Sequence, residues 1–441
     1  MDNRTKHYRV GLLGHYGQNN LGDEAIIWST IQNLRERIPD IELVGLSMNP
    51  EDTCRRFGIE AHPVRYIKTN LSGSNRQQGK SDPPEENESS LIRVLRHSVT
   101  NRIKKMVPKK TKMSVNGFLY LLGNLAAELQ FIKNSRDLLK TLDALIICGS
   151  GQIEDFSGPW RYPYTILKWV FLAKSADKKV LVVSVGAGPP SRKLSYWMYK
   201  KALSRADYLS YRDLWSKQVL ESHISGLNGK VFPDLANSLK TKSVNGHKKG
   251  NKIVAINPMP AFNSTLMKGA GNLVFENYVN NIAILANHAL KRGFKVILFN
   301  SHPADLTVIE KVSKQVRCLT NDNLEKLAIK RSDTVQDLVN TISEADLILP
   351  TRFHATMLPL LLGRPVLGLC YHDKSKALLD EVGLGDYYVD IYSFTDDELC
   401  RKFDLLIENI DQAKLKIKAK YNKYPKLMNE QWDQVVDLIL A

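Results

Sequence analysis

The run Leu347-Ile348-Leu349-Pro350-Thr351-Arg352-Phe353-His354-Ala355-Thr356 predicts the end of a buried strand followed by the start of a helix. Its apolar first part suits a parallel strand that is covered on both faces. Ligands of parallel sheets bind beyond the carboxyl ends of the strands. Where the backbone is still extended, Arg352 and His354 project to one side and Phe353 to the other. A permanent cation beside an imidazole favours a catalytic site over a structural histidine.

The same alternation of strand and helix recurs on both sides of this run. Apolar segments predict strands at 8–14, 41–46, 144–148, 180–185 and 208–211, and then at 252–257, 295–299, 347–350 and 366–369. Helices are expected from about Asp23, over 214–221 and over 276–292. Repeated alternation predicts an α/β protein with two doubly wound domains, at 1–240 and 251–395, followed by a helical segment at 396–441. The polar stretch 240–251 is the expected join, and a cleft between the domains is the expected ligand site.

The charge of the chain is concentrated in one segment. The chain has 441 residues and a formal net charge of +16. Between Arg65 and Lys112 there are twelve Lys or Arg against four acids, so a net +8 lies there. Because the remaining excess is spread thinly, the sequence argues against a nucleic-acid-binding face along the whole molecule. An anionic substrate or an anionic lipid surface fits the charge as well.

This basic segment is predicted to be an insert of the N-terminal domain, at about 69–115. Its second part places Leu91, Leu95, Val99, Ile103 and Met106 on one helical stripe, with Lys and Arg around it. Such a helix can lie on an anionic membrane surface. The alternative, which we favour, is a solvated helix packed on the N-terminal domain.

Several classes of protein find no support in the sequence. No apolar stretch of about twenty residues is present, and the first residues lack a secretory signal, so a cytoplasmic protein is expected, with the inner face of the membrane as the alternative location. The five cysteines are scattered and form no CxxC pair, which argues against a zinc site or a disulfide framework. Neither a Ser-His-Asp triad nor a Walker loop is recognisable, and no metal site is expected.

Three glycine-rich loops follow predicted strands. The loop 14–24 contains Asn19 and Asp23, and it reads equally well as a tight turn with a capped helix or as an anion-binding loop. The loops 148–155 and 185–190 should line the same edge of one sheet and present backbone amides there. Their candidate binding residues are Gly149, Gly151, Gly186 and Gly188.

Two further cations are candidates for the cleft. Arg212 lies between a short strand and a helix, where it could bind a carboxylate or phosphate with two parallel hydrogen bonds. The alternative is a surface arginine beside Asp213, with Asp213 as the helix cap. Lys374, in the run 370–375 after the last strand, would join the same rim.

The motifs, taken in order, resemble the polysaccharide pyruvyl transferase family. The resemblance covers about Tyr8 to Gly385, with the basic insert outside it. It rests on Gly-Gln-Asn-Asn-Leu-Gly-Asp-Glu (17–24), Cys-Gly-Ser-Gly (148–151), Val-Gly-Ala-Gly-Pro (185–189), Tyr-Arg-Asp (211–213), Pro-Asp-Leu-Ala (233–236), Thr-Arg-Phe-His-Ala (351–355) and Tyr-His-Asp-Lys (371–374). The chain departs from the family pattern at Ser150, which breaks a glycine triplet, and at His372.

This resemblance implies a GT-B-like fold, in which two Rossmann-like domains face a cleft, with the acceptor on the N-terminal side and the donor on the C-terminal side. It implies transfer of pyruvate from phosphoenolpyruvate to a sugar as a cyclic ketal, in exopolysaccharide or cell-envelope biosynthesis, without a cofactor. Arg352 and Arg212 would bind the donor's carboxylate and phosphate, and His354 would be the acid/base group. The acceptor could be a sugar, a glycan or a lipid-linked oligosaccharide, and the oligomeric state stays open.

Two other functions are compatible with these residues. A GT-B glycosyltransferase that uses a nucleotide sugar would share the architecture and the glycine-rich loops. A basic glycan- or lipid-binding protein without catalytic activity would share the charge.

Overall fold

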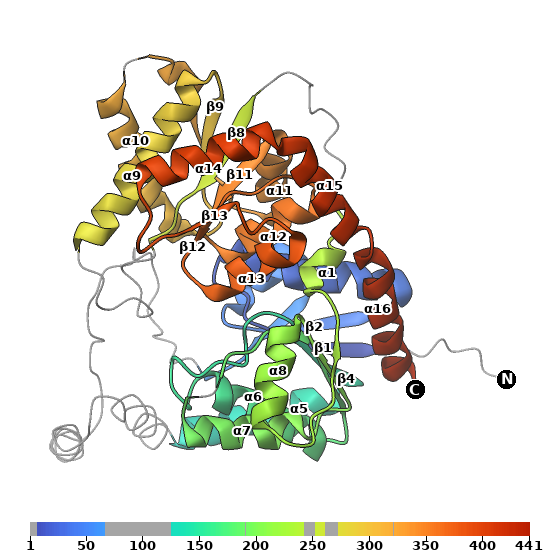
Figure 1. Cartoon of the computed structure of the whole chain (residues 1–441). Coiled ribbons are helices and arrows are strands. Elements are labelled where there is room, and N and C mark those ends of the chain that lie inside the picture. The colour runs from blue at the N-terminus through green and yellow to red at the C-terminus, as the bar shows by residue number, and fades with distance from the viewer. Residues whose placement is uncertain (1–6, 67–124, 190, 242–251, 261–271, 321) are drawn as a thin grey trace, which may run out of the picture.

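The computed structural model describes residues 7–66, 125–189, 191–241, 252–260, 272–320 and 322–441 (Figure 1). The basic insert expected at 69–115 and nearly all of the expected join at 240–251 lie outside the described residues, so the predictions for them stay predictions. Among the described helices, none has the length and apolar character that a membrane crossing requires.

The N-terminal lobe is built on a parallel sheet of seven strands, in the order β3-β2-β1-β4-β5-β6-β7. The strands are β1 (Arg9–Leu13), β2 (Glu42–Ser47), β3 (Glu60–Pro63), β4 (Ala144–Cys148), β5 (Lys179–Val185), β6 (Tyr208–Tyr211) and β7 (Lys230–Val231). The order reverses between β1 and β4, so the carboxyl ends of these two strands flank the crevice of a doubly wound sheet.

Helices cover both faces of this sheet. They are α1 (Leu21–Arg37), α2 (Pro50–Phe57), α5 (Leu125–Lys140), α6 (Tyr162–Ser175), α7 (Lys193–Leu203) and α8 (Leu214–His223). Alternate residues of the strands point to opposite faces. Leu12 of β1 therefore packs with α1, whereas its neighbour Leu13 packs in the cluster that contains Trp169 of α6.

The C-terminal lobe repeats this topology. A parallel four-stranded sheet has the order β10-β9-β8-β11, and a parallel pair, β12-β13, continues from β11 through a bridge between Ile348 and Val366. Its strands are β8 (Ile253–Asn257), β9 (Lys295–Phe299), β10 (Leu327–Lys330), β11 (Leu347–Pro350), β12 (Gly368–Cys370) and β13 (Tyr388–Asp390). Its helices are α9 (Asn272–Lys291), α10 (Leu306–Leu319), α11 (Val335–Glu344), α12 (Phe353–Leu361) and α13 (Asp373–Val382).

Three helices end the chain and connect the two lobes. They are α14 (Asp396–Glu408), α15 (Ile410–Tyr421) and α16 (Tyr424–Leu440). Figure 1 shows α14 lying across the C-terminal lobe, while α16, in dark red, returns to the N-terminal lobe. There the side-chain amide of Gln431 donates hydrogen bonds to Ser184 and Ser210, at 2.7 and 2.9 Å.

The two lobes share one hydrophobic core. A single cluster of buried side chains contains Val10 and Leu12 of β1, Ala255 of β8, Leu358 of α12 and Trp432 of α16. Helix α1 lies at its centre, because it packs against α11, α12 and α16. The N-terminus of α1 is therefore held against the carboxyl end of β11, where the candidate site was expected.

Candidate functional site

Arg352 is anchored by a buried carboxylate. Its Nε and Nη2 donate to Oδ1 of Asp305, at 2.9 and 2.7 Å, and Asp305 is fully buried. The same carboxylate accepts hydrogen bonds from the amides of Ser301 and His302. Asp305 thus fixes Arg352 to the loop that follows β9. Among the described residues none accepts a hydrogen bond from Nη1 of Arg352, whose side chain is 23% exposed, so one edge of the guanidinium is available to a ligand.

His354 faces the N-terminal lobe. Its Nε2 lies 3.8 Å from Oδ2 of Asp234, and neither atom has a hydrogen-bond partner among the described residues. A methyl group at Gly22, in the first turn of α1, would lie 2.4 Å from Cβ and Nδ1 of His354. The imidazole is therefore enclosed between a helix N-terminus and a buried carboxylate of the opposite lobe.

The expected extension of the backbone through Phe353 is not observed, because α12 begins at Phe353. Arg352 keeps extended angles as the residue before the helix. Its guanidinium turns to Asp305, the imidazole of His354 turns to Asp234, and the Phe353 ring lies under Arg212. The conditional prediction that Arg352 and His354 share one side, opposite Phe353, is thus not met, although all three residues border the contact between the lobes.

Asp234 is a buried carboxylate between two cationic side chains. Oδ2 lies 3.5 Å from Nη1 of Arg212 as well as 3.8 Å from His354. Burial raises the pKa of Asp234, but His354, Arg212 and the amide of Ala236 outweigh this effect and leave the pKa below its usual value. Asp234 therefore carries a negative charge at neutral pH.

Asp23 is a second buried carboxylate at this point. Oδ1 accepts a 2.7 Å hydrogen bond from Ser150, and Oδ2 lies 3.5 Å from Nδ1 of His15. Burial raises the pKa of Asp23, but His15, His354 and Ser150 together lower it below the usual value. Ser150, the departure from the family's glycine triplet, thus has a defined contact. It adopts a positive φ of 59°, which is uncommon for a residue with a side chain.

Arg212 lies in the contact between the lobes. Its side chain is 5% exposed, its Nε donates to Asp213 at 3.2 Å, and its guanidinium lies 4.5 Å from the centre of the Phe353 ring. A methyl group at Gly186 would lie 2.5 Å from its Cζ, so a glycine is needed at that position for Arg212 to pack there. Asp213 also caps α8 by accepting from the amide of Ser216, as expected. The expectation of a surface arginine is wrong, because Arg212 is buried, and binding of a carboxylate or phosphate by Arg212 stays a prediction.

The two later glycine-rich loops lie side by side, as expected. Gly186 donates to the carbonyl of Ser150 at 2.7 Å, and Gly188 donates to that of Ile153 at 2.9 Å. Gly149 donates to the carbonyl of Val183 at 2.8 Å. The prediction that these loops present free amides is therefore wrong for Gly149, Gly186 and Gly188, because their N–H groups are used to join the loops to each other and to the sheet.

Two other candidates take part in contacts within the protein. Lys374 forms a 2.6 Å ion pair with Glu154, which lies beside Gly151 and Gly188, so this pair connects the lobes. Asn19 is exposed, and its side-chain oxygen accepts a hydrogen bond from Arg56. The neighbouring Asn20, which we did not single out, caps α1 and binds Asp23 at 2.6 Å.

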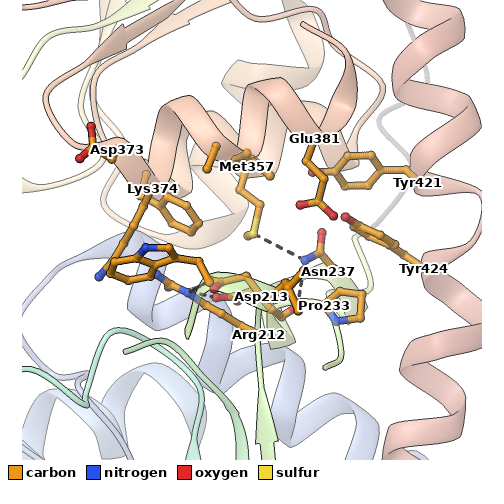
Figure 2. A pocket seen from close by; sticks show the side chains of 16 residues that line it. Arg212, Asp213, Pro233, Asn237, Met357, Asp373, Lys374, Glu381, Tyr421 and Tyr424 are labelled. Atoms are coloured by element: carbon orange, nitrogen blue, oxygen red, sulfur yellow. Dashed lines mark hydrogen bonds and ion pairs between the residues drawn. The ribbon is translucent and has the colours of Figure 1, made fainter. Parts of the chain in front are cut away.

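A pocket of about 370 Å³ opens beside these residues, and we call it the interlobe pocket. Figure 2 shows α12 and α13 on one side of it and the N-terminal lobe on the other, with α15 and α16 closing one end. Arg212 and Lys374 lie at one end of the pocket, and Arg212 shares its partner Asp234 with His354. Glu381, Tyr421 and Tyr424 line the end near the C-terminal helices. The expected cleft between the domains is therefore present.

A family model for polysaccharide pyruvyl transferases matches residues 20–373. The chain belongs to the polysaccharide pyruvyl transferase family. The matched range includes Asp23, Arg212, Asp234, Arg352 and His354, which the fold brings together, and it stops just before Lys374. The family places this protein among the transferases of polysaccharide biosynthesis.

One curated relative agrees with this assignment, and the solved structures show the fold. The transferase is 20% identical to the amylovoran biosynthesis protein AmsJ of Erwinia amylovora over 429 residues, which cover 93% of this chain and 94% of AmsJ. Its fold is similar to that of a putative UDP-N-acetylglucosamine 2-epimerase of Listeria monocytogenes (11% identity, TM-score 0.57, 98% and 95% of the two chains covered). The UDP-GlcNAc 2-epimerase of Neisseria meningitidis is equally similar (13% identity, TM-score 0.57, 98% and 99% covered). These likenesses support the GT-B-like fold.

The sequence interpretation of the transferase missed four side chains of the site. Asp234 lay within the quoted Pro-Asp-Leu-Ala run, and His15 lay within the first glycine-rich loop. Glu154 lay at the end of the second loop, whereas Asp305 lay outside all quoted motifs. An acidic residue in a motif that follows a buried strand was the available signal for Glu154. For Asp234 the signal was only its place in a motif of the family, because the strand before it, β7, is short and exposed.

Proposed function

We propose that this transferase moves pyruvate from phosphoenolpyruvate to a sugar of a glycan or glycolipid precursor, forming a cyclic ketal. The observation that carries the proposal is the position of His354, enclosed between Asp234 and the N-terminus of α1, with Arg212 3.5 Å from the same carboxylate. This arrangement supplies an acid beside Asp234 and Arg212, two residues that line the interlobe pocket, and Arg352 precedes His354 by two positions.

The chemistry requires these residue types. Protonation of the methylene carbon of phosphoenolpyruvate makes the neighbouring C2 electrophilic, and a protonated imidazole is a suitable general acid near neutral pH. A first sugar hydroxyl then adds to C2 and loses its proton, and phosphate leaves with the electrons of its bond to C2. A second hydroxyl attacks C2, loses its proton and closes the ketal ring.

Each polar residue has a defined part in this proposal. His354 delivers the proton, and Asp234, whose Oδ2 lies 3.8 Å from Nε2, orients the imidazole. The free edge of Arg352 and the guanidinium of Arg212 bind the carboxylate and phosphate of the donor. Asp305 positions Arg352 without contacting the substrate. That the reaction needs neither a metal ion nor another cofactor stays a prediction.

A binding experiment separates this function from the nucleotide-sugar alternative. We expect phosphoenolpyruvate to raise the melting temperature of the full chain, because a ligand that binds the folded state stabilises it. UDP-N-acetylglucosamine should have no such effect. Stabilisation by the nucleotide sugar alone would overturn the proposal.

A second experiment tests catalysis. With phosphoenolpyruvate and glycan from cells that lack this protein, His354→Gln should release phosphate about 10²–10⁴-fold more slowly than the wild type. The matched control is His288→Gln, because His288 lies on α9 and pairs with Asp404, outside the site. Equal rates for the two variants would contradict the proposed role, as would glycan that gains no pyruvate by mass spectrometry.

The expected peripheral contact with an anionic membrane also stays a prediction. Deletion of 90–110 should reduce sedimentation with anionic vesicles if the insert makes this contact.

A further inference from the structure

Three residues that line the interlobe pocket carry a buried polar atom without a hydrogen-bond partner among the described residues. Oδ2 of Asp234, Oδ1 of Asn237 and Oη of Tyr421 are buried and form no hydrogen bond among the described residues. Such atoms are rare in folded proteins, because each one loses its bonds to water without replacement. Two of the three are oxygen atoms that can only accept, so a ligand that satisfies them must donate hydrogen bonds.

The end of the pocket near the C-terminal helices adds further polar groups, among them Glu381, whose Oε1 pairs with Lys420. In Figure 2 the side-chain oxygen of Asn237 points toward Glu381 and Tyr424. The amide nitrogen of Asn237 donates to the carbonyl of Asp234 at 2.9 Å. Because this bond uses the amide nitrogen, the amide oxygen of Asn237 is the atom that remains for a ligand. A carboxylate, an amide oxygen and a phenol therefore converge on one small space.

The charge of the lining is opposite to that of the whole chain. Asp213, Asp234, Asp373 and Glu381 contribute four carboxylates, whereas Arg212 and Lys374 contribute two cations. Both cations are paired already, with Asp234 and Glu154 respectively. In a protein of net charge +16, the part of this pocket away from Arg212, which is proposed to bind the donor, is thus a poor place for a diphosphate or another anion.

Aromatic side chains form much of the remaining wall. Trp215, Phe353, Tyr421 and Tyr424 line the pocket together with apolar residues such as Met357. Aromatic faces are weakly negative, and the C–H groups of a sugar ring are apolar and weakly positive, so the two pack well. The volume of about 370 Å³ lies within the usual range for small-molecule sites. Aromatic faces combined with hydrogen-bond acceptors suit a neutral ligand rich in hydroxyl groups.

We propose that the interlobe pocket is the acceptor subsite and that it binds an uncharged sugar ring. The hydroxyl groups of the ring donate to Asn237 and Glu381 at the far end and to Asp234 at the near end. Asp234 also faces His354, so the hydroxyl groups next to it are those that attack the donor. This inference rests on the proposed pyruvyl transfer, and it assigns the sugar that receives the pyruvate to a defined set of side chains.

Saturation-transfer NMR on the full chain with methyl glycosides of glucose, galactose and mannose tests the pocket. We expect at least one of them to show contact with the wild-type protein. Ala377 is exposed at the pocket on α13, so Ala377→Trp should fill the space without disturbing the core and should abolish the signal. Asn237→Leu should weaken binding at least tenfold. Ala419→Trp, the same change at an exposed position of α15 outside the pocket, should bind as the wild type does.

The melting temperature with and without phosphoenolpyruvate is measured on the same samples. The combined results then distinguish failure of the acceptor-subsite proposal from failure of the pyruvyl-transfer proposal. Absence of any glycoside signal, or an unchanged signal in Ala377→Trp, overturns the acceptor subsite even where phosphoenolpyruvate still stabilises the protein. Displacement of the glycoside by uridine diphosphate also overturns it, because the pocket would then be a nucleotide site. A third outcome is that Ala377→Trp abolishes sugar binding but phosphoenolpyruvate does not stabilise the protein. This result would reject pyruvyl transfer, and the pocket would be a sugar-binding site only.

Discussion

Glu24 shows how the first turn of α1 combines a structural and an electrostatic role. The side chain is 1% exposed, and its Oε1 accepts a 2.9 Å hydrogen bond from the amide of Gly17. Burial raises the pKa of Glu24 to about 7, against the opposing effects of the Gly17 amide and of Arg56. A carboxyl group of this kind stabilises the fold when it is protonated.

The pH dependence of stability follows from this shift. The folded-state pKa of Glu24 lies above the ordinary glutamate value of 4.5. Its stabilising contribution is therefore complete below about pH 4.5 and is lost as the pH rises through about 7, by about 3 kcal/mol in total. Glu24→Gln keeps an acceptor for Gly17 and does not ionise. We expect this variant to melt at a higher temperature than the wild type at pH 8, with the difference vanishing below about pH 4.5.

The control for this prediction is Glu36→Gln on the same helix. Glu36 lies at the surface, where Lys240 lowers its pKa, so this change should not stabilise the protein at pH 8. If Glu24→Gln and the wild type have the same melting temperature at both pH values, ionisation of Glu24 does not lower the free energy of unfolding, and the prediction is wrong.

At the scale of single residues, the sequence identified the reactive groups better than their partners. Arg212 and His354 were predicted from their places after strands, because a parallel sheet gathers its carboxyl ends at one edge. Their shared partner, Asp234, is 120 positions before His354 in the chain. Contacts of this length depend on how the lobes pack, which the periodicity of one strand or helix does not contain.

The element that completes the site is the N-terminus of α1. Gly22 can lie this close to His354 because it has no side chain. A methyl group at this position would overlap the imidazole. Leu21 also donates its amide to the carbonyl of Ser301, at 3.0 Å across the lobes. The first turn of α1 thus sets the distance between the lobes at the point where the reaction is proposed to occur.

Gly22→Ala tests this role. The added methyl group would lie 2.4 Å from two atoms of His354, so α12 and α1 must separate, and overpacking of this kind costs about 1–3 kcal/mol. We expect phosphate release to fall at least about tenfold while the protein remains folded, as judged by circular dichroism. Gly385→Ala is the matched control, since its methyl group would meet only the carboxylate end of Asp380. Full activity in Gly22→Ala would mean that His354 does not need this close packing.

The strands divide into those that the sequence predicted and those that it did not. The bounds of β4, β6, β9 and β11 agree with the predicted segments, because these strands consist mainly of apolar residues inside a sheet. The prediction omitted β3, β7, β10 and β13. Each of these four lies at the edge of its sheet. Edge strands are short and half exposed, so they lack the continuous apolar run that identifies a buried parallel strand.

At the scale of the whole molecule, the lobes share a core and are not joined only by a linker. The cluster that contains Trp432 includes side chains from both sheets, and Trp432 itself is fully buried. Its indole N–H donates to Ser238 at 3.2 Å, next to the segment that carries Asp234. The C-terminal helix therefore supports the wall of the site as well as the contact between the lobes.

Trp432→Ala should destabilise the protein by about 3–5 kcal/mol, the usual cost of removing a fully buried aromatic side chain. Since the core is common to both lobes, we expect the urea midpoints measured by near-UV and far-UV circular dichroism to shift together. The matched control is Trp197→Ala, because Trp197 is 49% exposed on α7 and its loss should move the midpoints little. If the two midpoints of Trp432→Ala separate, one lobe unfolds without the other, and the shared core does not couple them. In that case the polar contacts between the lobes, such as the Lys374–Glu154 ion pair, would have to hold Asp234 and His354 together without help from the core.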